Sequence, residues 1–225
     1  MRLAVGTDDA QARQALAELC EAYWYPLYAY VRRSGKSPHD AEDLTQSFFA
    51  RLLERDILAA AHPDKGKLRT FLLTCARNFL ADEHARAMAG KRGAKLLVSF
   101  DAETAEGRYV KEPADDLTPD RLFQRRWAIT VLDFSLQTLE AEFSAQDKAE
   151  LFAAMRPFLG FGSEPERRYE EVAATLGMAM GTVKSHVFRL RQRWREILFE
   201  QVAATLADPT PEEIKAELAE LLGCV

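Results

Sequence analysis

Residues 169–197 read YEEVAATLGMAMGTVKSHVFRLRQRWREI, and this pattern predicts two helices joined by a glycine turn. Gly177 follows the first helix and tolerates the positive φ that a helix end often needs. Apolar residues recur at steps of three and four on both sides of the turn, at Val172, Ala173, Leu176, Val183, Val187 and Leu190. Two short helices with a shared buried face are the outline of a helix-turn-helix.

The second helix of this pair carries positive charge. From Met180 to Arg195 there are five cations and no acid, as a helix that enters a DNA groove requires for contact with phosphates. Arginine facing guanine and glutamine facing adenine would read bases, whereas Lys184 suits a phosphate. The alternative is a basic helix that is merely solvated. The residues expected to face DNA are Thr182, Lys184, Ser185, Phe188, Arg189 and Arg191 or Gln192.

The charge of the whole chain contrasts with this basic helix. A protein that holds DNA unaided usually has a basic surface, but these 225 residues carry a formal charge of -5. The basic patch is therefore local, and we expect a protein partner to supply most of the affinity for DNA. We also expect a cytoplasmic protein with no membrane contact, because no apolar run approaches spanning length and the first residues lack a secretory signal.

The cysteines and histidines suggest no metal site. Cys20, Cys75 and Cys224 lie far apart without CxxC or Cys/His spacing, so we expect reduced, largely buried thiols and no cofactor. A metal-dependent hydrolase is a remote alternative, because no histidine pair has the helical spacing of HExxH. The side chains that prompt this alternative are His39, Asp40, His62, Asp64, Asp82 and His84.

The rest of the chain also has helical periodicity, so the predicted fold is all-α, with two small helical domains joined by a flexible acidic linker. Residues 9–33 predict one or two helices around Pro26. Ser37 and Pro38 supply an N-cap and a first-turn proline for a helix to about Glu54. A third element should run from Leu68 to about Met88.

The region after residue 90 loses this pattern. Between Asp101 and Asp120 there are seven acids and two bases, and glycine and proline leave little to pack. Near the end, Thr210 should cap a last amphipathic helix that carries Ile214, Leu218, Leu221 and Leu222. The predicted domains are residues 1–92 and 121–200, with the linker at 93–120 and a C-terminal helical extension at 201–225.

Three motifs in this order resemble sigma factors of bacterial RNA polymerase, in the extracytoplasmic-function group of the sigma-70 family. DAEDLTQSFFARLLE, residues 40–54, is similar to the helix that binds the polymerase clamp. LRTFLLTCARNFLADEHAR, residues 68–86, resembles the helix that melts and reads the -10 promoter element, and residues 169–197 resemble the -35-reading motif. The resemblance implies a non-enzymatic initiation subunit that binds promoter DNA and core RNA polymerase, at the β′ clamp and the β flap.

The first motif is physically suited to docking. A stripe of Ala41, Leu44, Phe48 and Leu52 should face inward and leave polar side chains to face a partner. A solvated acidic face is the alternative, and Ser47 stands where the family commonly has an acid. The residues that the resemblance assigns to polymerase binding are Asp40, Asp43, Leu44 and Gln46.

The second motif implies capture of an unpaired base. Relatives cradle such a base in the loop that corresponds to residues 59–67, which shifts the equilibrium toward open DNA. Arg77 and Asn78 have a plainer alternative, as capping and ion-pairing groups within a bundle. The residues assigned to -10 DNA are Lys67, Arg69, Arg77, Asn78 and Arg86.

Two segments depart from the family. LGFGSEPERR, residues 159–168, lengthens the approach to the helix-turn-helix, and the tail after Leu198 is an addition that many members lack. Three roles for the tail stay open: it covers the second domain, contacts an anti-sigma factor or caps a core. The linker is either a solvated tether or a segment that threads the polymerase's RNA path. A competing function is a free-standing regulator with an N-terminal sensing or dimerisation domain.

Overall fold

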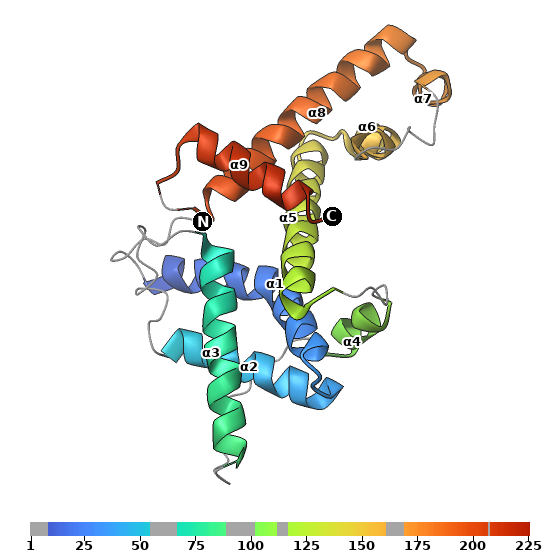
Figure 1. Ribbon diagram of the computed structural model, residues 1–225. Helices are drawn as coiled ribbons and strands as arrows, with labels where there is room; N and C mark the ends of the chain where they lie inside the picture. Colours follow the sequence, from blue (N-terminus) through green and yellow to red (C-terminus); the bar gives the residue numbers. More distant parts are fainter. Residues whose placement is uncertain (1–8, 55–66, 89–101, 112–116, 161–168, 207) are drawn as a thin grey trace. The chain divides into compact units, whose positions relative to one another are not determined.

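The structure of the chain is a computed structural model that describes residues 9–54, 67–88, 102–111, 117–160, 169–206 and 208–225. Within these ranges the regular secondary structure is helical and includes no strand, which confirms the predicted all-α class (Figure 1). No helix in this part of the chain has both the length and the apolar character needed to cross a membrane.

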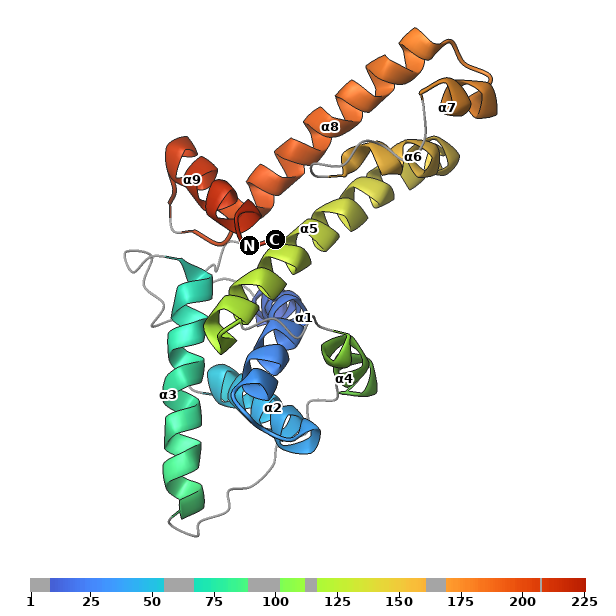
Figure 2. The ribbon, with the colours of Figure 1, turned by 45° about the vertical axis from the view of Figure 1, so that its right-hand side comes forward.

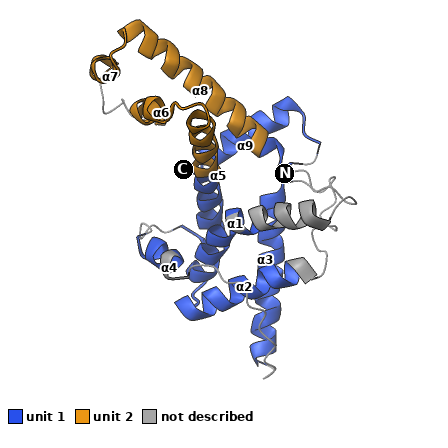
Figure 3. Ribbon diagram, turned by 180° about the vertical axis from the view of Figure 1, so that it is seen from behind, with its two compact units in different colours: residues 1–130, 202–225 blue, residues 131–201 orange. Residues whose placement is uncertain are grey.

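The chain divides into two compact units, residues 1–130 with 202–225, and residues 131–201 (Figure 3). The first unit contains α1 Asp9–Arg33, α2 Pro38–Glu54, α3 Leu68–Met88, α4 Ala102–Val110, the start of α5 Pro119–Ser144, and α9 Pro211–Leu222. The second contains the rest of α5, α6 Ala149–Met155, the 3₁₀ helix η2 Arg156–Leu159, α7 Tyr169–Leu176 and most of α8 Met180–Ala203. Packing defines these units, and the functional division into domains stays a prediction.

Local sequence signals place several helix ends correctly. The backbone N–H of Asp40 donates to Ser37 Oγ at 3.1 Å, so Ser37 caps α2 as predicted. Thr210 caps α9 in a reciprocal capping box with Glu213, also as predicted. The helix α1 continues through Pro26 as a single element.

Aromatic side chains form the core of the first unit, where α1 lies beside α2 (Figures 1 and 2). The rings of Trp24 and Phe49 lie 5.8 Å apart between α1 and α2, and Phe48 reaches Phe79 of α3 at 5.7 Å. Tyr23 of α1 stacks on Trp127 of α5 at 6.0 Å. Large rings on four helices therefore bury much of the apolar surface that holds this unit together.

Helix α4 is an element that the sequence analysis did not predict. It lies within the acidic segment, and Ala105 is 4% exposed. Glu106 Oε1 pairs with Arg32 Nη2 at 2.8 Å, and Tyr28 Oη donates to Glu106 Oε2 at 2.5 Å. These partners lie more than 70 residues away along the chain, so the helix depends on contacts that local composition does not reveal.

The second unit is built around the predicted pair of helices. Gly177 has φ +62°, the conformation that ends α7. Phe158 stacks on Tyr169 at 4.4 Å, and Trp194 Nε1 donates to Ser135 Oγ at 2.7 Å. Together these contacts attach α7 and α8 to the α5–α6 part of the unit.

Candidate functional site

The outer face of α2 carries the predicted polymerase-binding residues. Asp40 is exposed, whereas Asp43, Leu44 and Gln46 are half-buried. Asp40 Oδ2 accepts from Ser37 Oγ at 2.7 Å, and Gln46 Nε2 donates to Glu42 Oε1 at 3.1 Å. The inward stripe is confirmed at Ala41, Phe48 and Leu52, each buried, but Leu44 lies at its edge and retains exposed surface.

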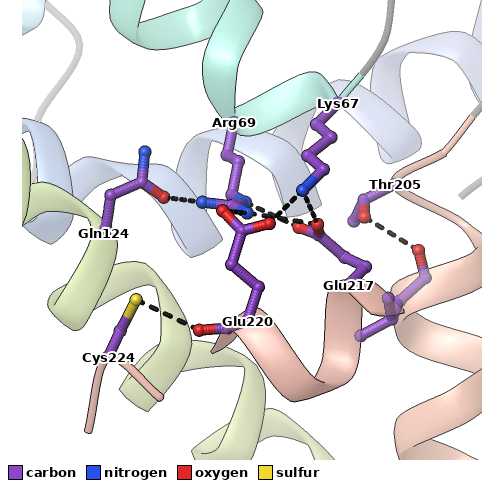
Figure 4. A network of polar contacts seen from close by, with 8 residues as sticks. Lys67, Arg69, Gln124, Thr205, Glu217, Glu220 and Cys224 are labelled. Atoms are coloured by element: carbon purple, nitrogen blue, oxygen red, sulfur yellow. Dashed lines mark hydrogen bonds and ion pairs between the residues drawn. The ribbon is translucent and has the colours of Figure 1, made fainter. Parts of the chain in front are cut away.

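Lys67, directly before α3, and Arg69, in its first turn, contact carboxylates of α9 (Figure 4). Arg69 Nε donates to Glu217 Oε1 at 2.6 Å, and Arg69 Nη2 pairs with Glu220 Oε1 at 2.7 Å. Lys67 Nζ lies 2.6 Å from Glu217 Oε2 and also contacts Glu220. The side chain of Arg69 is 3% exposed and that of Glu217 is 0% exposed, so the centre of this network is shielded from solvent.

Two further groups complete the surroundings of Arg69. Its guanidinium donates to the side-chain oxygen of Gln124 on α5 and lies 5.5 Å from the centre of the Trp127 ring. Leu68 N donates to Thr205 O at 3.3 Å, which joins the start of α3 to the segment before α9. Figure 4 shows Gln124, Glu217 and Glu220 around the guanidinium of Arg69.

The electrostatics of the network follow from these contacts. Burial would lower the pKa of Arg69 and of Lys67, but hydrogen bonds to Glu217 and Glu220 outweigh it and raise both values. Hydrogen bonds from Lys67 and Arg69 hold the pKa of Glu220 below its ordinary value. Both side chains therefore carry their positive charge, and carboxylates of the same chain balance it.

The later part of α3 is more open. Arg77, Asn78 and Arg86 are exposed, as contact with DNA would require. Arg77 Nη2 pairs with Asp120 Oδ2 at 2.6 Å, and Arg86 pairs with Glu83 one turn earlier. Exposed pairs of this kind are weak and exchange readily. Residues 59–66 of the predicted base-binding loop lie outside the described residues.

The face of α8 opposite its apolar stripe is fully accessible. Val183, Val187 and Leu190 are each 1% exposed, whereas Phe188 on the other face is 61% exposed. Each residue predicted to face -35 DNA is exposed, namely Thr182, Lys184, Ser185, Phe188, Arg189, Arg191 and Gln192.

The cations of α8 differ in what holds them. Arg191 Nη2 donates to Phe158 O at 2.8 Å, which attaches α8 to η2. Arg193 Nη2 pairs with Glu142 Oε1 on α5 at 2.7 Å. Arg189 Nε makes only a long contact of 3.4 Å with the Ser185 carbonyl, one turn earlier on the same helix. The side chain of Arg189 is therefore better placed for an outside ligand than that of Arg191 or Arg193.

The described residues hold no cluster of three His, Cys, Asp or Glu side chains that would suit a metal ion. His62 and Asp64, which prompted the hydrolase alternative, lie outside these residues. Cys20 is buried, while Cys75 and Cys224 are half-buried, so the expectation of largely buried thiols holds for Cys20 alone. Burial raises the pKa of the Cys20 thiol to about 11.

Parts of the chain are similar in sequence to known proteins. The family described as sigma-70 region 2 matches residues 19–89, which include all of α2 and α3. A relative named ECF RNA polymerase sigma factor SigE, from Mycolicibacterium smegmatis, is 27% identical over 199 residues, which cover 88% of this chain and 67% of the relative. These two matches support the resemblance to the extracytoplasmic-function group of the sigma-70 family. No solved structure is significantly similar to it.

The carboxylates of α9 are the site residues that sequence reasoning missed. Glu217 lies between Ile214 and Leu221 on the buried face of α9, and all three are at most 4% exposed. An acid within an apolar helical stripe requires a buried partner, and this signal was available in the sequence. The sequence did not reveal that this partner is Arg69, which lies 148 residues earlier.

Proposed function

We propose that this sigma-70 family protein binds core RNA polymerase and directs promoter-specific initiation, while the polymerase carries out the catalysis. The match of residues 19–89 to sigma-70 region 2 carries the proposal. The named relative, a sigma factor of RNA polymerase, supports it. In this proposal residues 1–92 bind the polymerase and the -10 element, and residues 121–200 bind the -35 element.

In the -35 domain, α8 is the reading helix. Arg189 and Gln192 are proposed to contact base edges, and Lys184 a phosphate. The exposure of this face, including a phenylalanine at position 188, supports the assignment. Arg191 would have to leave the carbonyl of Phe158 to reach DNA, so we assign it first to holding α8 in place.

In the first domain, the proposed polymerase contact is the outer face of α2, with Asp40, Asp43, Leu44 and Gln46. The exposed Arg77, Asn78 and Arg86 of α3 are proposed to meet the -10 strand. Lys67 and Arg69 belong to the same proposed surface, but α9 carboxylates neutralise them. The β′ clamp and the β flap are the proposed docking sites on the polymerase.

Run-off transcription with purified bacterial core polymerase and genomic DNA tests the proposed function. Promoter-specific transcripts that depend on the added chain are expected. Asp43→Asn should weaken capture of the chain by core polymerase, whereas the matched variant Asp133→Asn, an exposed acid on α5, should not. Specific DNA binding without capture by core polymerase would instead favour a free-standing regulator.

A second experiment separates promoter reading from polymerase binding. Arg189→Ala should weaken recognition of the -35 element and leave capture by core polymerase unchanged. Arg195→Ala removes an exposed cation from another side of α8 and is the matched control. Equal loss of DNA recognition and polymerase capture in Arg189→Ala would argue against the assignment of α8.

A further inference from the structure

The start of α3 is an anion-binding site whose present ligand belongs to the chain itself. Lys67 and Arg69 offer an ammonium and a guanidinium, and Glu217 and Glu220 of α9 bind both (Figure 4). Guanidinium groups bind carboxylates and phosphates with the same two-pronged geometry. The chemistry that holds α9 is therefore the chemistry that would hold a nucleic-acid backbone.

We propose that α9 is an intramolecular competitor of DNA, which occupies the Lys67–Arg69 site until phosphates of the -10 strand replace it. The inference rests on the proposed function, because it concerns the same DNA-binding surface. It assigns an autoinhibitory role to the C-terminal extension.

Charge makes the two ligands mutually exclusive. Residues 211–222 contain four acids and one base, and two of the acids touch the cations directly. A DNA strand that approached the docked helix would meet neutralised cations and an excess of negative charge. Binding of the strand at this site thus requires α9 to leave.

The docking of α9 is suited to exchange. Few residues of this 12-residue helix are buried, namely Ile214, Glu217 and Leu221, and isolated helices of this length are marginal in water. Glu220 is 52% exposed and Lys67 35% exposed, so water and ions reach the edge of the network. When α9 leaves, water solvates both members of each ion pair, and this hydration offsets most of the lost attraction.

A binding measurement with the full chain tests the competition. The probe is a fluorescein-labelled oligothymidine of about 20 nucleotides, a length that exceeds the usual single-strand site of one small domain. Glu220→Gln keeps the shape of the side chain and removes one competing charge, so its affinity for the probe should rise at least about fivefold, the lower end of typical coupling between sites. Glu212→Gln removes the same charge from an exposed position that is outside the network, and should change affinity much less.

An equal gain in probe affinity in Glu220→Gln and Glu212→Gln would mean that net charge alone causes the effect, and would overturn the inference. So would the absence of any gain in Glu220→Gln, or failure of every variant to bind the probe at low salt. A second measurement needs no variant: hydrogen exchange of the amides of α9 should accelerate when the probe is added to the unaltered chain. Unchanged protection of α9 in the bound state would also overturn the competition.

These outcomes are separate from those of the proposed function. Promoter-specific transcription can succeed while α9 stays docked, in which case the autoinhibitory role fails and the sigma function stands. Conversely, absence of run-off transcripts and of polymerase capture would remove the proposed function even if the probe displaces α9.

Discussion

Replacing Arg69 by methionine tests how tightly the buried ion pair couples α3 to α9. The substitution keeps a long side chain over Trp127 but removes contacts of 2.6 Å and 3.1 Å to the two oxygens of Glu217. Removing one partner of a buried pair costs about 3–5 kcal/mol, because the other charge stays buried without compensation. Lys67 still lies 2.6 Å from Glu217, so we expect the lower end, about 3 kcal/mol.

The double variant R69M/E217M distinguishes an uncompensated charge from lost packing. Exchange of both ions for apolar side chains is often nearly neutral, so the double variant should recover to within about 1 kcal/mol of the unaltered chain. Arg86→Met is the control, because the side chain of Arg86 is 48% exposed in its pair with Glu83. Its cost should stay below about 1 kcal/mol.

Urea unfolding, followed by circular dichroism and tryptophan fluorescence, measures these differences as shifts in midpoint at constant slope. A loss in R69M no larger than that in the Arg86 control would refute the reasoning. A double variant as unstable as R69M would refute it too, since the cost would then lie in packing around the guanidinium.

Three further predictions concern local structure and pH. Ser37→Ala should cost about 1 kcal/mol in thermal unfolding, because the N–H of Asp40 loses its cap. Gly177→Ala should cost about 1–2 kcal/mol: space for the methyl group is open, but φ is +62°. Hydrogen bonds from Arg193 hold the pKa of Glu142 below 4.5, so the unfolded chain takes up this proton first as pH falls. The free energy of unfolding should therefore decline below about pH 4.5, and Glu142→Gln should flatten that decline in a pH series of urea titrations.

The predictions that succeeded rest on interactions between residues close in sequence. Ser37 caps its own helix, Thr210 and Glu213 cap each other, and Gly177 adopts the conformation that a helix end requires. The apolar stripe of α8 likewise follows from helical periodicity, and its inward residues are buried. Such features need only a few consecutive residues, so the chain's pattern is sufficient to predict them.

The exposed face of α8 was predicted for the same reason. Once Val183, Val187 and Leu190 are assigned inward, the positions on the opposite side, such as Lys184, Phe188 and Arg189, have to face outward. The predicted exposure of these side chains did not show which cations form hydrogen bonds or ion pairs within the protein. Arg191 and Arg193 have partners 33 and 51 residues away, and their spacing on the helix gives no sign of it.

Sequence pattern was enough to identify an all-α chain, the bounds of α2 and α3 and their resemblance to sigma-70 region 2, because periodicity, caps and turns are local properties. Tertiary structure was needed to show that α4 packs on α1 through Glu106, and that Glu217 and Glu220 bind Lys67 and Arg69. An ion pair forms between charges that the fold brings within a few ångströms. The sequence alone is compatible with many other pairings of these acids and bases. The partner of a charged side chain is therefore a property of the folded chain.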